Sequence, residues 1–569
     1  MTVAEYIVQT LVNFNVTDVF GVPGGVVFDF LYAIDENSKI IAHLSSNEQA
    51  AGYAAIGYAQ AFGRLGVAYA TRGPGITNMI TPIADAFFDS VPVLFLTAHN
   101  KKFITTKQRF TEEQEFDTIA TVKKITKYAA RIEKVSDVRP ILIKLLSAAL
   151  TGRQGSVLLD IQEKLLKMTI DELPIKESDL LKKSNSDIKS FIVSFERNIS
   201  SCSKPVFLIG NGVRQSKTAY YIRNLASKMQ VPIISSGIAL DLVKGSEFFF
   251  GFIGSHGSRI ANYILYHADV IFVFGNRMAY DKKSETFSSI SKKKIVRIEI
   301  DKEELSNNNS REDFCYDLSN IFNNLEKQLK VQIKFPKWFD FCEKVKKILI
   351  KESVPKPEKE LFSIFNYVDE NFSLVTDIGN NEFWVADAYS RSSLTNRLIM
   401  SKSFAALGSA LSKAIGVYYA TSKPVIAFVG DHAMIYSFQE LLFIKNNNLP
   451  IIVFIINNYS SGMIKSKQKL QNRKKYIHST LDSGYHVPDF YKIAKASGLK
   501  YYEFNSLSLQ KHITKEKISP CVIELKISSN ETLPRLPKGN LPFEFVPELR
   551  ESLKEKLRRL ENETSVSRS

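Results

Sequence analysis

The stretch 425-VIAFVGDHAMIYSFQELLFIKNNNLPIIVFIINNYSSGM-463 decides the fold. It begins with a short continuous apolar run, 425–429, which is typical of a strand buried on both faces. Ile435, Phe438 and Leu442 then recur at helical spacing, and a second apolar run occupies 451–456. This order predicts a parallel strand–helix–strand unit. Sheets of that kind bind ligands at the carboxyl ends of their strands.

Oxygen-bearing side chains follow both strands of this unit. Asp431 comes after the first strand, and Asn457 and Asn458 come after the second. One carboxylate, one amide oxygen and a nearby carbonyl are too few for a Ca²⁺ cage, but they suit Mg²⁺, which also binds water and substrate phosphate. Backbone amides after Gly430 can face a diphosphate. Taken alone, either pair could equally be an ordinary strand end with polar turn residues.

The spacing of the two pairs resembles the thiamine diphosphate motif, which opens with Gly-Asp-Gly and closes with Asn-Asn. The resemblance implies that Asp431, the Asn458 side chain and the Ser460 carbonyl hold Mg²⁺ on the cofactor diphosphate. It places four further residues against the cofactor: Gly430, His432, Ala433 and Met463. His432 stands where the motif has its second glycine, so it is either a diphosphate contact or a structural replacement.

Glu48 is the candidate acid–base residue of the N-terminal part. It follows a predicted strand and begins a helix of small residues, 49–62. Poor solvation would raise its pKa toward neutrality, which suits proton exchange. A helix-start carboxylate that favours the helix dipole explains the same position equally well.

Four fragments resemble the pyrimidine-binding domain of the acetolactate synthase branch of thiamine diphosphate enzymes: FGVPGG, SSNEQAAGYAAIGYAQAFG, RGPGITN and ADAFFDSVPVLFLTA. The resemblance implies that Glu48 hydrogen-bonds the aminopyrimidine and so promotes loss of the thiazolium C2 proton. It places Gly25 near the reacting centre and makes Gln114 a contact to intermediates, although Glu113 replaces the family's phenylalanine. Arg72 replaces the family's serine. His99-Asn100 stands where simple decarboxylases have two histidines, which argues against release of a free aldehyde.

The resemblance extends through the rest of the chain. Gly379, Asn380 and Asn381 fall near the diphosphate. Ala405 supplies a carbonyl to the 4′-amino group, and Leu407 is the apolar wedge that bends the cofactor. In the middle part, His256 and Arg277 match positions of members that bind FAD. Two alternatives remain for the middle part: it binds FAD, or it keeps a vestigial FAD site.

Length and composition limit the classes of protein to which the chain can belong. The 569 residues suggest three or four domains. The net charge of +16 comes from lysines spread along the chain, so we expect no nucleic acid partner. We expect no membrane span and no signal peptide, because there is neither a long apolar run nor a basic start before an apolar core. Four scattered cysteines favour a reducing cytoplasm.

We therefore expect an α/β fold with three parallel-sheet domains of the thiamine diphosphate type. The predicted boundaries are 1–170 for the pyrimidine-binding domain, 188–330 for the middle domain, 358–530 for the diphosphate-binding domain and 531–569 for a tail. The resemblance implies a homodimer or homotetramer in which Glu48 and the Mg²⁺ site come from different chains.

By the same resemblance, the enzyme decarboxylates a 2-oxo acid, first of all pyruvate, and transfers the acyl carbanion to a second carbonyl compound to form acetolactate. One alternative is acetyl transfer to an anionic acceptor such as a nucleotide-linked keto sugar, because Lys467 replaces the family's tryptophan beside Lys469 and Arg473. A solvated helix face explains these basic residues equally well. Non-oxidative decarboxylation of a 2-oxo acid is a third alternative for the activity. An inactive binding protein of the same fold is the non-enzyme alternative.

Overall fold

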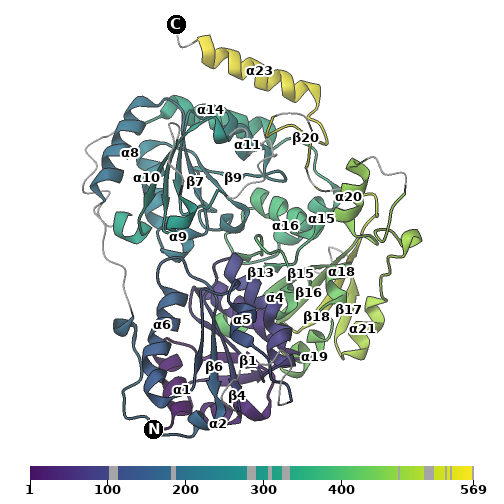
Figure 1. Cartoon of the computed structure of the whole chain (residues 1–569). Helices are drawn as coiled ribbons and strands as arrows, with labels where there is room; N and C mark the ends of the chain where they lie inside the picture. The colour runs from purple at the N-terminus through teal and green to yellow at the C-terminus, as the bar shows by residue number, and fades with distance from the viewer. Residues whose placement is uncertain are drawn as a thin grey trace.

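The computed structural model describes residues 1–100, 113–180, 188–278, 290–305, 311–322, 333–471, 475–504, 518–531, 533, 535–538 and 541–566. Within these ranges, three six-stranded sheets follow one another along the chain. Neighbouring strands within each of the three are parallel. The prediction of three α/β domains is confirmed, and Figure 1 shows them in purple and blue, teal, and green.

The N-terminal sheet has the order β2-β1-β3-β4-β6-β5. Its strands are β1 (Asp18–Gly21), β2 (Ile41–Leu44), β3 (Gly66–Tyr69), β4 (Val93–His99), β5 (Tyr128–Ile132) and β6 (Val157–Gln162). The helices around it are α1 (Val3–Asn13), η1 (Gly25–Val27), α2 (Phe28–Asp35), α3 (Glu48–Phe62), α4 (Pro74–Phe88), α5 (Thr118–Val122), η2 (Val135–Asp137), α6 (Val138–Leu150), α7 (Glu163–Leu166) and η3 (Glu177–Asp179).

The middle sheet has the order β12-β11-β10-β7-β8-β9. Its strands are β7 (Pro205–Ile209), β8 (Ile233–Ser235), β9 (Phe249–Phe252), β10 (Val270–Phe274), β11 (Lys294–Glu299) and β12 (Arg311–Cys315). Its helices are α8 (Lys189–Ser201), α9 (Gly212–Gln215), α10 (Ala219–Met229), η4 (Gly237–Ala239), α11 (Arg259–His267), η5 (Lys302–Glu304) and α14 (Pro336–Leu349).

The third sheet has the order β14-β13-β15-β16-β18-β17. Its strands are β13 (Ser373–Thr376), β14 (Leu398–Ile399), β15 (Val425–Gly430), β16 (Ile451–Asn457), β17 (Lys500–Glu503) and β18 (Cys521–Lys526). Its helices are α15 (Lys356–Phe365), α16 (Asn380–Arg391), α17 (Ala410–Thr421), α18 (Asp431–Ile435), α19 (Glu440–Asn446), α20 (Gly462–Leu470), η6 (Leu481–Ser483) and α21 (Phe490–Ala496). Beyond it lie β19 (Leu536–Pro537), β20 (Phe545–Val546) and α23 (Glu551–Val566).

The quoted stretch forms the centre of the third sheet. β15 and β16 pair in parallel from Val425 and Ile451 onward, as predicted. The single helix expected between them is wrong, because a turn divides it into α18 and α19. The apolar residues at helical spacing are also not core residues, since Ile435, Phe438 and Leu442 are 38%, 43% and 51% exposed.

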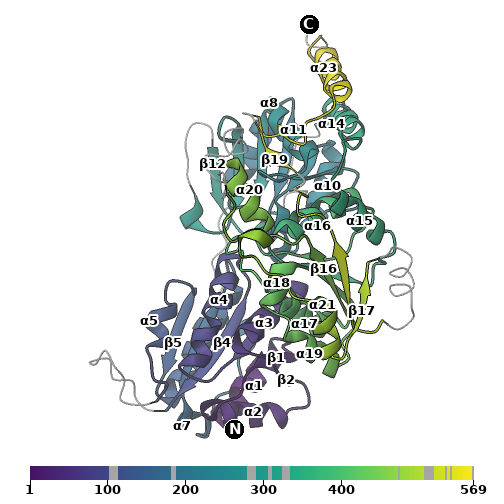
Figure 2. The same ribbon diagram turned by 90° about the vertical axis from the view of Figure 1, so that its right-hand side faces the viewer.

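The first and third domains are locked together through α3 and α17. The helices cross at glycines, and a Cβ added to Gly416 would lie 1.8 Å from the Ala54 carbonyl oxygen. Beside this crossing, Lys413 Nζ lies 2.8 Å from Asp85 Oδ2, and both side chains are buried. Figure 2 shows α3 and α17 side by side between the two sheets. No helix in the described ranges is both long and apolar enough to cross a membrane.

Candidate active site

Asp431 lies at the carboxyl edge of the third sheet, directly after β15. Its Oδ1 accepts hydrogen bonds from the Tyr485 hydroxyl and the His432 backbone amide, each at 2.8 Å. Its buried Oδ2 has no hydrogen-bond partner among the described residues. Backbone amides of Tyr459 and Ser460 also face the carboxylate. The chain beyond β16 therefore closes over Asp431, as the predicted metal site requires.

The electrostatics of Asp431 fit a cation. Burial raises its pKa to about 6, and hydrogen bonds from Tyr485 and backbone amides offset only part of that effect. A carboxylate that is desolvated and lacks a positive partner is unfavourable, and a bound divalent ion removes the penalty. The residues present thus fit Mg²⁺.

The two asparagines after β16 have different roles. Asn457 is occupied, because its Nδ2 donates to Glu524 Oε1 at 2.6 Å and its Oδ1 accepts from the Tyr459 amide at 3.1 Å. Asn458 is buried, and its Nδ2 donates to Ser460 Oγ at 3.0 Å, which directs its Oδ1 away from that contact. Asn457 is thus a structural residue, and the assignment of Asn458 to the metal stays a prediction.

The residues predicted near the diphosphate come together beside this site. Gly379 has φ +133° and precedes α16; a Cβ there would lie 2.8 Å from Asn381 Oδ1, and one on Gly430 would lie 3.2 Å from the same atom. Asn380 is buried, and neither polar atom of its side chain has a partner among the described residues. A Cβ on Gly462 would lie 2.3 Å from Asn380 Nδ2. Buried polar groups without protein partners are typical of a ligand-binding site.

The segment predicted to cradle the cofactor is held by a residue that the sequence argument did not single out. Asp377 is fully buried at the end of β13. Its Oδ1 accepts from the Gly408 amide at 2.9 Å, and its Oδ2 accepts from the Ala410 amide at 2.8 Å. These bonds fix the loop in which Ala405 is exposed with φ +59° and Leu407 is half-buried.

His432 is a packed side chain at the edge of the site. Its ring stacks on Tyr485, with centroids 5.2 Å apart, and lies 5.6 Å from the Tyr436 ring. Burial lowers its pKa, and its buried Nδ1 has no partner among the described residues. Tyr485, which also binds Asp431, was not foreseen. Ala433 is buried in α18, and Met463 is half-buried in the first turn of α20.

Glu48 begins α3 at the carboxyl edge of the first sheet. Its Oε2 accepts from Asn78 Nδ2 at 3.0 Å, and its Oε1 would lie 3.4 Å from a Cβ on Gly75. The side chain is only partly buried, so the expected poor solvation is wrong for a single chain. Gly25 is exposed, and a Cβ there would meet nothing within 4 Å in the described structure.

Gln114 lies on the same edge as Glu48. It is exposed with φ +58°, and a Cβ on Gly73 would lie 2.4 Å from its carbonyl oxygen. The structure therefore groups the site residues into two sets on two sheets: Glu48, Gly25 and Gln114 on the first, and the metal and diphosphate residues on the third.

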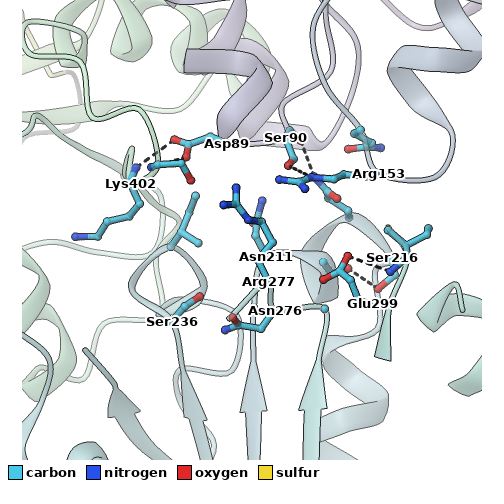
Figure 3. Close-up of a pocket in the computed structure, with 18 of the residues that line it drawn as sticks. Asp89, Ser90, Arg153, Asn211, Ser216, Ser236, Asn276, Arg277, Glu299 and Lys402 are labelled. Atoms are coloured by element: carbon cyan, nitrogen blue, oxygen red, sulfur yellow. Dashed lines mark hydrogen bonds between the residues drawn. The ribbon is translucent and has the colours of Figure 1, made fainter. Parts of the chain in front are cut away.

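A separate cavity of ≈ 1320 Å³ opens between all three domains. In Figure 3, Arg153 approaches from the N-terminal domain and Arg277 from the middle sheet. Both guanidinium groups contact Glu304 Oε1, at 3.0 and 3.1 Å. His256 also lines the cavity; its Nδ1 lies 2.8 Å from the Arg535 carbonyl, and burial lowers its pKa. The backbone of Gly210 and Gly212 forms part of the wall.

The structure explains only some of the basic side chains that follow Met463. Lys467 and Lys469 are exposed on α20, whereas Lys465 Nζ donates to the Ser529 carbonyl at 2.6 Å. Arg473 lies outside the described residues.

Comparison with known families covers all three domains. Residues 1–120 match "Thiamine pyrophosphate enzyme, N-terminal TPP binding domain", residues 196–325 match the central domain and residues 377–525 match the C-terminal TPP binding domain.

Among curated proteins, the chain is similar to the acetolactate synthase large subunit of Lactococcus lactis, with 31% identity and 94% of each chain covered. It is 27% identical to a probable acetolactate synthase large subunit of Methanococcus aeolicus, over 98% of this chain and 97% of that one. Acetolactate synthase 1 of Nicotiana tabacum is 29% identical, over 87% and 77%. The chain therefore belongs to the thiamine pyrophosphate enzymes, in the acetolactate synthase large-subunit family.

Proposed function

We propose that this chain decarboxylates pyruvate and joins the remaining two-carbon unit to a second carbonyl compound, forming acetolactate, with thiamine diphosphate and Mg²⁺ as cofactors. One observation carries the proposal: Asp431, Asn380 and Asn458 are buried beyond the strand ends of the third sheet, and polar side-chain atoms of Asp431 and Asn380 have no partner among the described residues. The nearly full-length similarity to acetolactate synthase large subunits supports carboligation over the alternatives.

The residues have distinct tasks in this reaction. Asp431, Asn458 and the Ser460 carbonyl would hold Mg²⁺, and the glycine backbones at 379 and 430 leave room for a diphosphate. When bound, thiamine diphosphate supplies the electron sink that lets carbon dioxide leave. Glu48, oriented by Asn78, would bind the aminopyrimidine ring and hold its proton.

The first test is pyruvate turnover with thiamine diphosphate and Mg²⁺, in which carbon dioxide and all carbon products are followed by NMR. Wild type should form acetolactate, and Glu48→Gln should lose at least about a hundredfold in rate. Carbon dioxide with acetaldehyde alone would favour the simple decarboxylase. Failure to bind thiamine diphosphate would favour the inactive binding protein.

We propose that the active enzyme is at least a homodimer, with Glu48 of one chain facing the metal site of the other. Large exposed apolar side chains flank both residue sets, a pattern that marks protein interfaces. Next to Gly25 and Glu48 these are Phe28, Tyr32, Ile41 and Leu44; next to Asp431 they are Ile435, Tyr436 and Phe438. A partner covering Glu48 would also supply the burial that this residue lacks in a single chain.

Mixing two inactive variants tests this arrangement. A hybrid of a Glu48→Gln chain and an Asp431→Ala chain would contain one intact site, so random remixing should restore about a quarter of wild-type activity. Light scattering gives the mass of each variant. If each site is built within one chain, dimeric mixtures should stay inactive, and the shared-site arrangement would be refuted.

FAD is a further proposed ligand, because the three-domain cavity is larger than an ordinary small-molecule pocket. Arg153 and Arg277 would face its pyrophosphate and exchange their contacts with Glu304 for it. Flavin fluorescence titration should show binding by wild type and weaker binding by Arg277→Ala. Arg197→Ala, at an exposed pair with Glu312, is the matched control. No flavin binding by wild type would favour a vestigial site.

The exposed lysines of α20 leave the anionic acceptor as a minor alternative. Replacing Lys467 and Lys469 with glutamine should leave acetolactate formation from pyruvate unchanged if they are a solvated face. A selective loss with an anionic sugar acceptor would instead support that second function.

A further inference from the structure

A two-stranded hairpin near the C-terminus contacts the middle domain. Its strands β19 and β20 pair in antiparallel, with Leu536 opposite Val546. We call the described residues around it, 535–538 and 541–547, the clasp. Figure 1 shows β20, and Figure 2 shows β19, beside α11 of the middle domain. The clasp thus reaches the middle domain, although it follows the third sheet in the sequence.

The side chain of Arg535 fixes the clasp to the third domain. It is 4% exposed, and its Nη1 donates at 2.5 Å to Oδ1 of Asp387 on α16. Its Nη2 donates to Glu352 Oε1 at 2.9 Å. Arg391 pairs with both of these carboxylates, and Arg259 pairs with Glu352. Because a buried charge that loses its partner is costly, these pairs hold the clasp in one docked position.

The backbone of the clasp holds the loop between β9 and α11 in the middle domain. His256 Nδ1 lies 2.8 Å from the Arg535 carbonyl oxygen, and a carbonyl can only accept, so Nδ1 carries the proton of this hydrogen bond. Three residues further on, Arg259 donates to the carbonyl oxygens of Phe543 and Pro547, at 2.6 and 2.8 Å. The clasp therefore bonds this loop at both ends.

The loop that the clasp holds forms one wall of the three-domain cavity. Residues 254–257 line the cavity, and so does Phe383 near the start of α16. The His256 ring meets the Phe383 ring edge-on, with centroids 4.8 Å apart. Asp387, to which Arg535 donates, lies one turn further along the same helix. The clasp therefore connects two walls of the cavity that belong to different domains.

We propose that docking of the clasp and binding of FAD in the three-domain cavity stabilise each other. The inference rests on the proposed binding of FAD. A ligand that fits between the two walls favours the arrangement in which they are held together, and Arg535 holds that arrangement. Such coupling is reciprocal, so each event strengthens the other by the same factor. Arg535 acts through His256 and α16, and it is a positioning residue for the cavity.

Hydrogen exchange tests the coupling on the unmodified enzyme. Flavin-free wild type, loaded with thiamine diphosphate and Mg²⁺, is compared with and without saturating FAD. The amide of Lys538 donates to the Glu544 carbonyl within the clasp at 2.8 Å, and it should exchange at least about fivefold more slowly with FAD. The amides of α21, none of whose described residues line the cavity, are the control and should be unchanged.

Arg535→Met tests the role of the ion pairs. The two carboxylates keep Arg391 and Arg259, so the cluster stays paired and the third domain should still fold. Flavin fluorescence titration should show FAD binding weakened about 5- to 100-fold, and FAD should no longer slow exchange in the clasp. Lys538→Met is the matched control. This lysine lies on the clasp, but its pair with Glu548 is exposed, so FAD affinity should stay within about twofold.

The outcomes separate this inference from the proposed function. If wild type binds no FAD, the proposed flavin site fails, and this inference fails with it. If wild type binds FAD but exchange in the clasp does not slow, only the coupling is refuted. Unchanged FAD affinity in folded Arg535→Met, or an equal loss in Lys538→Met, would refute it as well. If Arg535→Met does not fold, the exchange result on wild type decides alone.

Discussion

The buried carboxylate of Asp431 predicts that one substitution will stabilise the cofactor-free protein. Burial raises its pKa from 3.8 to about 6. A shift of that size corresponds to about 3 kcal/mol of preference for the protonated form. Because the folded-state pKa lies above the unfolded value, stability is greatest at low pH and is lost as the pH rises through about 6. At neutral pH the metal-free fold carries the whole penalty.

Asp431→Asn removes this charge but keeps an acceptor for the Tyr485 hydroxyl, which donates to Oδ1 at 2.8 Å. Metal-free Asp431→Asn should therefore exceed wild type by up to about 3 kcal/mol near pH 8, and the difference should shrink toward pH 4. Urea unfolding at several pH values, with chelator present, measures it. Asp171→Asn, at an exposed position, should change stability by less than about 0.5 kcal/mol.

Addition of thiamine diphosphate and Mg²⁺ should make wild type more stable than Asp431→Asn. Thiamine diphosphate with Mg²⁺ at about 100 times the dissociation constant should stabilise wild type by about 2.7 kcal/mol and Asp431→Asn much less. A variant that is less stable than wild type without metal at pH 8 would refute the electrostatic argument. Equal stabilisation of both proteins by the cofactors would refute the assignment of Asp431 to the metal.

Three further predictions concern the support of the site. Lys413→Met should cost about 3–5 kcal/mol in urea unfolding, because Asp85 would remain buried and unpaired, and adding Asp85→Leu should recover most of the loss. Gly416→Ala should lower stability by about 1–3 kcal/mol, because the new methyl group meets the Ala54 carbonyl; unchanged melting would contradict the close crossing of α3 and α17. Asp377→Asn should weaken thiamine diphosphate binding at least about tenfold in calorimetry, because one of its two anchored amides loses its acceptor, while far-ultraviolet circular dichroism stays unchanged.

The sheets were predictable because strands buried on both faces have a direct signature in the sequence. The runs 425–429 and 451–456 are buried throughout β15 and β16, and their pairing follows from parallel topology. The positions of Asp431 and Asn458 at the sheet edge were predictable for a related reason. A polar residue directly after a buried strand lies at the carboxyl edge of the sheet. This position does not depend on how the helix between the two strands packs.

Residues that act through tertiary contact had no such signature. Tyr485 meets Asp431 across 54 positions of the chain, and nothing around it in the sequence resembles a site. Asp377 lies at a strand end, but its carboxylate serves two backbone amides more than thirty residues away. His99 Nδ1 lies 2.8 Å from Asp160 Oδ1, and this pairing depends on β4 lying next to β6, which adjacency along the chain does not predict.

The apolar positions around α18 and α19 show where one chain's sequence stops being sufficient. Ile435, Phe438 and Leu442 recur at helical spacing but are exposed, whereas Leu441 and Ile444 form the core side of α19. Helical periodicity indicates that one face of a helix is apolar, but it does not identify the surface that covers this face. Because these exposed residues follow Asp431, and a similar group surrounds Glu48, we infer that a second chain covers them. The same argument accounts for the incomplete burial of Glu48, which explains why the proposed reaction and the proposed dimer depend on each other.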